Sequence, residues 1–137
     1  MIYAVIDTNV FVAALLSRHS DSATVQVVNI LMESGICPLY NSEIIDEYKN
    51  VLHRDKFHFP SDAIDAIINM VQKIGISTER VQSYEKFPDP KDVVFYEVAL
   101  SKDDAYLVTG NIRHFPKTPI VVTPAEMIEI LTNQSLA

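Results

Sequence analysis

Short runs of apolar residues alternate along this chain with longer segments in which apolar residues recur at helical spacing. The clearest run, residues 2–6, holds five consecutive apolar residues, as expected for a strand that is buried on both faces. Further runs predict strands at residues 36–40, 76–81, 105–108 and 119–122. The pattern therefore predicts five strands.

The segments between these strands predict helices whose ends carry capping residues. Asn41, Asp89 and Thr123 are placed as N-caps, and Gly35 and Gly75 follow the last turns of two helices. The expected helices cover residues 10–16, 22–33, 42–54, 61–73, 90–100 and 125–131. The resulting order, β-α-α-β-α-α-β-α-β-α, predicts an α/β fold with a central parallel sheet of about five strands, covered by helices on both faces.

Length and composition predict a single domain over residues 1–137. The chain is 48% hydrophobic and 21% charged, which supplies enough apolar surface for a full core. Cys37 is the only cysteine, so an internal disulfide and a cysteine-rich zinc site are excluded. The longest unbroken apolar run, residues 10–16, is far shorter than the ~20 residues of a membrane span, and the first strand leaves no room for a signal peptide. These features predict a cytoplasmic protein.

The formal net charge is −7, from 18 acidic and 11 basic residues. This balance argues against nucleic-acid binding, because most domains that bind nucleic acid carry a basic surface. However, carboxylates that bind metal ions add negative charge which the ions then neutralise. An acidic chain is therefore still compatible with phosphate chemistry.

Asp7 directly follows the first predicted strand and directly precedes a helix. In open parallel sheets, ligands bind outside the carboxyl ends of the strands, so this carboxylate is aimed towards the crevice where a site would lie. It fits equally well as the cap of the helix, a role that strand-to-helix turns often require. Thr8 is an alternative cap, which would leave Asp7 free. Thr109, Gly110 and Asn111 follow the fourth predicted strand in the same way.

Two further acids lie at the margins of apolar helix faces. Glu47 lies beside Ile44 and Val51 on its helix, which fits either a side chain that reaches out to water or a ligand that points into a crevice. Asp92 lies on the apolar face of its own helix, but it also stands three residues after Asp89, as in a capping box. Taken alone, Asp92 is better explained by capping.

The three carboxylates Asp7, Glu47 and Asp92 are more informative together than singly. If they converge in one crevice, they repel one another unless a cation binds between them. Oxygen-rich sites select hard ions such as Mg²⁺ or Mn²⁺, and these ions activate water and stabilise charge on a phosphodiester. The predicted chemistry is therefore metal-dependent cleavage of nucleic acid.

Other polar residues give weaker signals. The four histidines lack metal-ligand spacing and are expected at the surface or partly packed, and Cys37 is expected in the core. The sequence has no glycine-rich phosphate loop, which argues against a nucleotide cofactor. Residues 53–59 mix basic and aromatic side chains, as single-strand binders do, although a solvated loop is the simpler explanation. Arg113, His114 and Lys117 follow the fourth strand and could touch a phosphate backbone.

The segments that carry these features match a known family. They are residues 5–10 (VIDTNV), 42–48 (SEIIDEY), 89–92 (DPKD) and 107–111 (LVTGN). In their order and spacing the chain resembles a PIN domain over essentially its whole length, and specifically the small bacterial PIN proteins regarded as toxins of toxin–antitoxin pairs. The resemblance implies a three-layer α/β/α sandwich with the site of an Mg²⁺- or Mn²⁺-dependent ribonuclease.

The resemblance also implies roles for individual residues. The residues in the metal-ligand positions are Asp7, Glu47 and Asp92. Asn9 and Thr109 correspond to polar residues that order the site. Asn111 completes the predicted catalytic group, but it stands where the family often has a fourth acid, so the second metal position and the catalytic rate are in question. Asp104 is a conceivable substitute, although we expect it at the opposite end of the fourth strand.

Three hypotheses from different classes follow. The first is an endoribonuclease that cuts single-stranded RNA; its toxin role would imply a small antitoxin that blocks the acidic cleft with an Arg or Lys side chain, and dimers are common in the family. The second is a catalytically weak or inactive PIN-like module that binds RNA or protein, which Asn111 and the acidic composition favour. The third is an α/β phosphotransfer protein, which we rank lowest. Haloacid-dehalogenase-type phosphatases need an acid at the position of Asn9, and receiver domains need paired acids where Asp7 stands alone.

Overall fold

The structure is a computed structural model that describes the backbone of residues 1–136 and the side chains of residues 1–134. At its centre lies one sheet of five parallel strands in the order β3-β2-β1-β4-β5. The strands are β1 (Ile2–Ile6), β2 (Ile36–Tyr40), β3 (Ile76–Ser77), β4 (Tyr106–Val108) and β5 (Val121–Val122). The predicted α/β class and the parallel sheet of about five strands are both confirmed.

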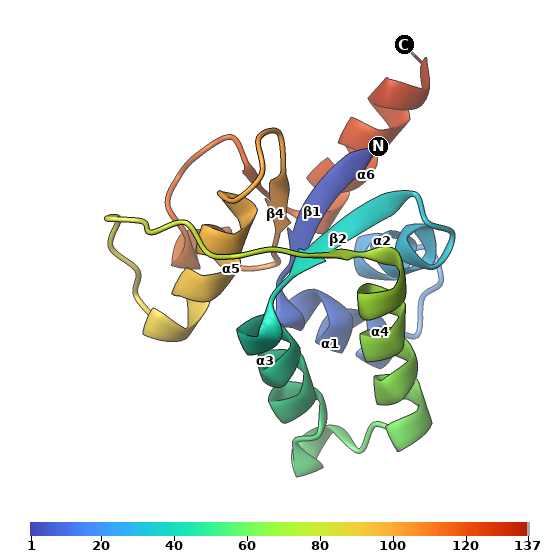
Figure 1. Ribbon diagram of the computed structural model, residues 1–137. Coiled ribbons are helices and arrows are strands. Elements are labelled where there is room, and N and C mark those ends of the chain that lie inside the picture. The colour runs from blue at the N-terminus through green and yellow to red at the C-terminus, as the bar shows by residue number, and fades with distance from the viewer. Residues whose placement is uncertain (137) are drawn as a thin grey trace.

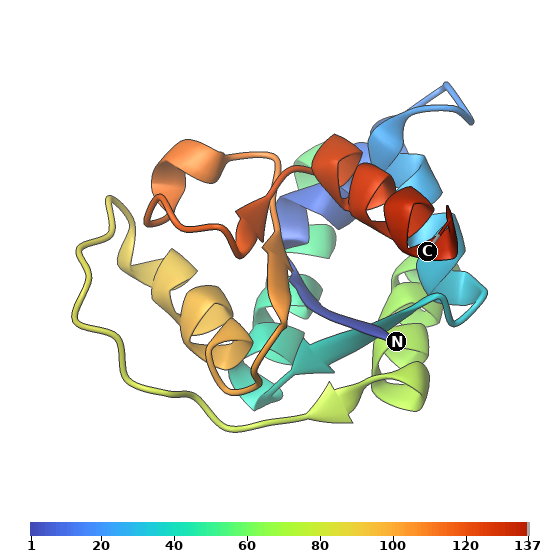
Figure 2. The same ribbon diagram turned by 90° about the horizontal axis from the view of Figure 1, so that it is seen from above.

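Helices cover both faces of this sheet (Figure 1 and Figure 2). The helices are α1 (Thr8–Leu16), α2 (Ala23–Met32), α3 (Ser42–Leu52), α4 (Ser61–Ile74), α5 (Val93–Ala99) and α6 (Pro124–Leu136), with short 3₁₀ helices η1 (Asp55–Phe57), η2 (Pro90–Asp92) and η3 (Ile112–His114). α5 packs against β1, β2 and β4 on one side, and α2 and α4 pack against β2 on the other, where α6 lies on α2. Within residues 1–136, no helix is both long and apolar enough to cross a membrane.

The strand order creates a crevice between the ends of β1 and β4. β1 pairs with β2 on one side and with β4 on the other. From β1 the chain passes to β2 and β3, which lie on one side of β1, and then through α5 to β4 and β5, which lie on its other side. The direction in which strands are added to the sheet therefore reverses between β1 and β4. Open α/β sheets bind ligands at such a switch point. The residues that follow β1 and β4 are therefore the first to consider for a site.

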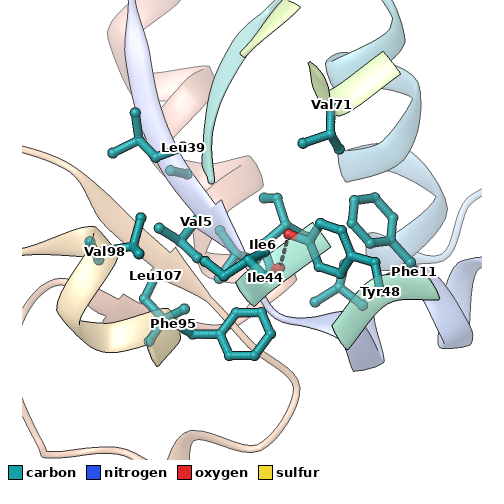
Figure 3. Packing of buried hydrophobic residues seen from close by; sticks show 14 of the residues in the cluster. Val5, Ile6, Phe11, Leu39, Ile44, Tyr48, Val71, Phe95, Val98 and Leu107 are labelled. Atoms are coloured by element: carbon teal, nitrogen blue, oxygen red, sulfur yellow. Dashed lines mark hydrogen bonds between the residues drawn. The ribbon is translucent and has the colours of Figure 1, made fainter. Parts of the chain in front are cut away.

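The strand residues that the apolar runs predicted form the core. Val5 and Ile6 of β1 are fully buried, as are Leu39 of β2 and Leu107 of β4. They meet apolar side chains of α3 and α5 in one continuous cluster (Figure 3). Burial of an aliphatic side chain of this size contributes roughly 1.5–3 kcal/mol. The central strands are therefore firmly anchored, and so are the turns that begin where they end.

The predicted edge strands are too long. Only Ile76–Ser77 of the predicted strand 76–81 pairs with the sheet, and only Val121–Val122 of the predicted strand 119–122. After β3 the chain leaves the sheet because the buried carboxylate of Glu97 in α5 draws it away: Arg80 Nε and the Ser83 N–H donate to the two oxygens of Glu97 at 2.8 and 2.6 Å. One buried acid thus holds the start of the segment from β3 to η2, and Phe87 holds its later part by packing against Tyr96 and Phe115.

Gly35 and Gly75, which the sequence predicted as helix caps, are required for a different reason. After α2, Ser34 takes the left-handed conformation with φ 62°, whereas the φ of Gly35 is not positive. Gly35 is needed because a Cβ there would lie 2.6 Å from Ile30 Cγ2. At Gly75, which follows α4, a Cβ would lie 2.4 Å from the carbonyl oxygen of Pro38. Both glycines are required by close packing and not by backbone conformation.

Candidate functional site

A hollow opens at the carboxyl edge of the sheet, where the turns after β1 and β4 meet α3, η1 and η2. We call it the carboxyl-edge cleft. Its polar and aromatic lining consists of Asp7, Thr8, Asn9, Glu47, Arg54, Phe57, Asp89, Lys91, Asp92, Phe95, Asn111 and His114. Every residue that the sequence predicted for the site lines this cleft, with the exception of Thr109, which lies fully buried directly behind Asp7. The switch point of the sheet and the predicted chemistry thus coincide.

Asp7 occupies the N-cap position of α1 but does not cap the helix, since its side chain makes no capping hydrogen bond. Instead, Asp7 Oδ2 accepts a hydrogen bond of 2.7 Å from Thr109 Oγ1. Asp7 as a whole residue is only 7% exposed. Burial raises the pKa of Asp7 to about 6, and the neighbouring charge of Asp92 adds to this, against the lowering effect of the Thr109 hydrogen bond. The ambiguity at Asp7 is therefore resolved: the side chain points into the site.

Two polar side chains join the turn after β4 to the turn after β1. Thr109 Oγ1, which donates to Asp7, also accepts a 3.0 Å hydrogen bond from the Asn111 N–H. Asn9 Oδ1 accepts a longer one, 3.3 Å, from the Gly110 N–H. The side chain of Asn111 is exposed and lines the cleft. Thr109 and Asn9 thus fix the positions of Asp7 and Asn111 relative to each other.

Asp92 faces the cleft with an unsatisfied oxygen. The predicted capping box is wrong, because Asp89 Oδ1 accepts from the Lys91 N–H at 2.9 Å while the side chain of Asp92 caps nothing. Asp92 Oδ2 is buried and has no hydrogen-bond partner; His114 Nδ1 lies 3.4 Å away. Burial raises the pKa of Asp92, as do the charges of Asp89 and Glu47, whereas His114 lowers it. His114 is thus the cationic neighbour of this oxygen, and at 3.4 Å its contact is too long for a strong hydrogen bond.

Glu47 is held in place through its neighbour Tyr48. Tyr48 is fully buried, and its hydroxyl donates a 2.6 Å hydrogen bond to the carbonyl oxygen of Ile6, the residue before Asp7 (Figure 3). Its ring packs edge-on against Phe11 with centroids 5.1 Å apart. α3 is therefore fixed directly to the end of β1. Glu47 lies half-buried at the margin of this face and lines the cleft, as its helical position predicted.

The carboxylates face one cleft but stand apart. Among residues 1–136, no three acidic, histidine or cysteine side chains are close enough together to hold one metal ion. Their electrostatic effects on one another show that they are neighbours nonetheless, since Glu47 raises the pKa of Asp92 and Asp92 that of Asp7. The all-oxygen donor set and the unpartnered Asp92 Oδ2 fit a hard divalent cation.

The cleft also contains cationic groups, of which His114 and the run 53–59 that includes Arg54 gave only weaker signals in the sequence. Arg54, Lys91 and His114 line it together with the acids. The expectation that His114 is merely a surface or partly packed histidine is therefore incomplete, because η3 turns it towards Asp92. Its position three residues after Asn111, on the same short helical turn, was the available signal. Arg113 and Lys117 line a separate, more apolar hollow nearby.

Asp104, the conceivable fourth acid, lies at the amino end of β4 as expected. It takes a left-handed conformation with φ 67° in the turn before the strand. It lines a hollow at the opposite edge of the sheet, with Met1 and Tyr3. Asp104 therefore contributes nothing to the carboxyl-edge cleft, where the corresponding position is held by the amide of Asn111.

Comparison with known families gives one result. Residues 3–113 match the family described as PIN domain. The matched region contains β1, α3, η2 and β4, and with them all the residues predicted for the site. It ends one residue before His114. No protein of curated function matches the chain.

Proposed function

The chain belongs to the PIN domain family, whose members are in general metal-dependent nucleases, and from this premise we propose that it is an endoribonuclease that cuts single-stranded RNA with Mg²⁺ or Mn²⁺. The observation that supports this most strongly is the convergence of Asp7, Glu47 and Asp92 on one cleft from three separate elements. Burial without compensation favours the protonated form of a carboxyl group. Two partly buried acids beside a third are explained if a cation completes the site.

Under this proposal the residues of the cleft have three different roles. Asp7, Glu47 and Asp92 hold the cation, and the hydrogen bond from Thr109 keeps one oxygen of Asp7 in a fixed position. A bound divalent ion would supply activation of water and stabilisation of the charge that builds on the phosphodiester. Asn111 offers an amide that can orient a water or a phosphate oxygen.

Cationic side chains around the acids would place the substrate. Arg54 and Lys91 line the same cleft and can neutralise phosphates on either side of the scissile one. His114 contacts Asp92 at 3.4 Å and would position that carboxylate. The net charge of −7 is then compatible with RNA binding. The substrate would contact the cationic side chains and the acids whose charge the metal ion neutralises, so the local charge at the cleft matters more than the average charge of the protein.

We also propose the cellular setting that accompanies such an activity. A cytoplasmic toxin needs an inhibitor, and an acidic cleft of this kind would accept an Arg or Lys side chain of a small antitoxin protein in place of the cation. A homodimer is compatible with this arrangement. Co-expression with a candidate partner gene, followed by purification on a tag of one chain only, tests the pairing directly.

A second function is favoured by one observation. Asn111 removes a negative charge from the position where a fourth acid would help to hold a second ion. A protein that binds RNA without cutting it would have the same fold and the same cationic rim. The two functions differ in what metal does: it switches cleavage on in the first and affects binding alone in the second.

Cleavage of a labelled single-stranded RNA by wild type, Asp7→Asn and Asp65→Asn, with Mn²⁺, Mg²⁺ or EDTA, tests the proposal. Asp65 is exposed on α4 and serves as a control of equal charge. We expect cutting that needs metal, is lost in Asp7→Asn and is kept in Asp65→Asn. If the wild type binds the RNA but does not cut it in any metal, the binding module is the correct assignment.

A further inference from the structure

One rim of the carboxyl-edge cleft is aromatic. It is formed by η1 and the residue pair that follows, in the connection between α3 and α4. Phe57 and Phe59 stack face to face, with ring centroids 5.1 Å apart and planes inclined by 9°. Phe59 packs against the hydrophobic core, whereas Phe57 lines the cleft and is half-buried. Phe57 is therefore a ring that Phe59 supports and that lines the cavity holding the acids.

The residue between the two rings has an uncommon backbone conformation. His58, between the two phenylalanines, has φ 54° and ψ 33°, the left-handed region that residues with a side chain adopt rarely. Side chains at positions i and i+2 lie on the same side of an extended chain, ~6.6 Å apart. With the turn at His58 between them, the two ring centroids lie closer than that, at 5.1 Å, and the rings stack.

Positive charge flanks the ring pair. Lys56 Nζ lies 5.1 Å from the centroid of the Phe57 ring, within the range of a cation–π contact. Arg54, one turn earlier, lines the carboxyl-edge cleft and also a second hollow, which Phe59 and His53 help to form. An aromatic face beside two cations, on the edge of an acidic cleft, is complementary to a polymer that alternates flat bases with phosphates.

We propose that Phe57, supported by Phe59, stacks a base of the single-stranded substrate, while Arg54 and Lys56 contact the adjoining phosphates. This inference rests on the proposed function, because it assigns a binding role to the same cleft. Acids repel phosphates, so affinity for RNA has to come from groups beside them. Stacking on an aromatic ring provides such affinity without selecting a sequence. A duplex cannot use the ring, since its bases are already stacked, and the platform therefore also selects single strands.

The absence of tryptophan from the sequence makes a direct test possible. Phe57→Trp places the only indole of the protein on the platform, and a base that stacks on it quenches its fluorescence. The matched control is Tyr3→Trp: Tyr3 also has a lysine over its ring, Lys102 at 4.1 Å, but it lies at the opposite edge of the sheet. Both proteins are titrated in EDTA with a short oligouridylate and with an abasic oligonucleotide of equal length.

We expect oligouridylate to quench Phe57→Trp strongly and Tyr3→Trp little, and the abasic strand to quench neither. Phe57→Leu should weaken oligouridylate binding about tenfold and Phe57→Tyr should restore it, at unchanged unfolding midpoints. Equal quenching by the abasic strand, or wild-type affinity in Phe57→Leu, would overturn the inference. The titrations contain no metal, so they are independent of cleavage: a nuclease without quenching refutes the platform alone, and quenching without nuclease activity refutes the proposed reaction alone.

Discussion

Replacement of Asp7 by Asn should make the metal-free protein more stable at neutral pH. The carboxyl group of Asp7 is buried, and burial raises its pKa from 3.8 to about 6. Folding therefore favours the protonated group. The stability that this group contributes is fully present below pH 3.8 and is lost as the pH rises through 6. At pH 7 the folded protein keeps an ionised carboxylate in a place that disfavours it.

The magnitude follows from the difference between the two pKa values. A change from 3.8 to about 6 corresponds to about 3 kcal/mol of lost stability above pH 6. Asn has the shape of the protonated acid, and its carbonyl oxygen can still accept the hydrogen bond from Thr109. Its amide group lacks an assured acceptor, which reduces the gain. We expect Asp7→Asn to raise the free energy of unfolding by about 1–3 kcal/mol at pH 7.

Urea unfolding in EDTA at pH 7 and at pH 4 measures this effect, with Asp65→Asn as the control of equal charge on an exposed position of α4. The gain in Asp7→Asn should shrink towards zero at pH 4, where the wild-type carboxyl is largely protonated. Mn²⁺ should then stabilise the wild type but not Asp7→Asn, because a ligand that binds only the folded state adds to its stability. A loss of stability in Asp7→Asn that is equal at both pH values would refute the reasoning.

Three further substitutions test the supports of the site. Tyr48→Phe removes the buried hydrogen bond from α3 to β1 and should cost about 1–2 kcal/mol in urea unfolding and weaken Mn²⁺ binding in calorimetry; unchanged Mn²⁺ affinity would show that α3 is held otherwise. Thr109→Val removes a hydrogen bond that lowers the pKa of Asp7, so Mn²⁺ binding, which needs this carboxyl ionised, should require a higher pH in calorimetry. A pH dependence of Mn²⁺ binding that does not move argues against Asp7 as the titrating group. Arg80→Ala leaves the carboxylate of Glu97 buried with fewer donors and should cost about 2 kcal/mol, with faster proteolysis between residues 78 and 89; the same protease sensitivity as wild type would contradict it.

The local pattern of hydrophobic residues predicted the fold class and the central strands, but not the bounds of the edge strands. Strands buried on both faces leave continuous apolar runs, so residues 2–6 and 36–40 were predicted with the observed bounds. β3 lies at the edge and is exposed, and its end is decided by a contact between Arg80 and Glu97 across 17 positions of sequence. A distant ion pair leaves no trace in the periodicity of a strand.

The residues of the site, too, could be predicted only in part from the local sequence. Asp7 follows a strand and could be predicted to point into the crevice, but only its hydrogen bond to Thr109, 102 residues away, distinguishes it from a helix cap. Asp92 was better explained by capping when taken alone, and the structure shows that Asp89 alone does the capping. Phe57 lines the cleft, whereas the run 53–59 was more simply explained from the sequence as a solvated loop, because its contact with the acids joins segments distant in the chain.

Anomalous diffraction from crystals of the RNA-free protein soaked in Mn²⁺ tests the central claim most directly. The account predicts an anomalous peak in the carboxyl-edge cleft, within bonding distance of oxygens of Asp7 and Asp92, with Glu47 rotated towards it. The same peak should be missing from crystals of Asp7→Asn. Peaks only elsewhere on the surface, or none at Mn²⁺ concentrations that support activity, would contradict a metal-dependent site built from these three acids.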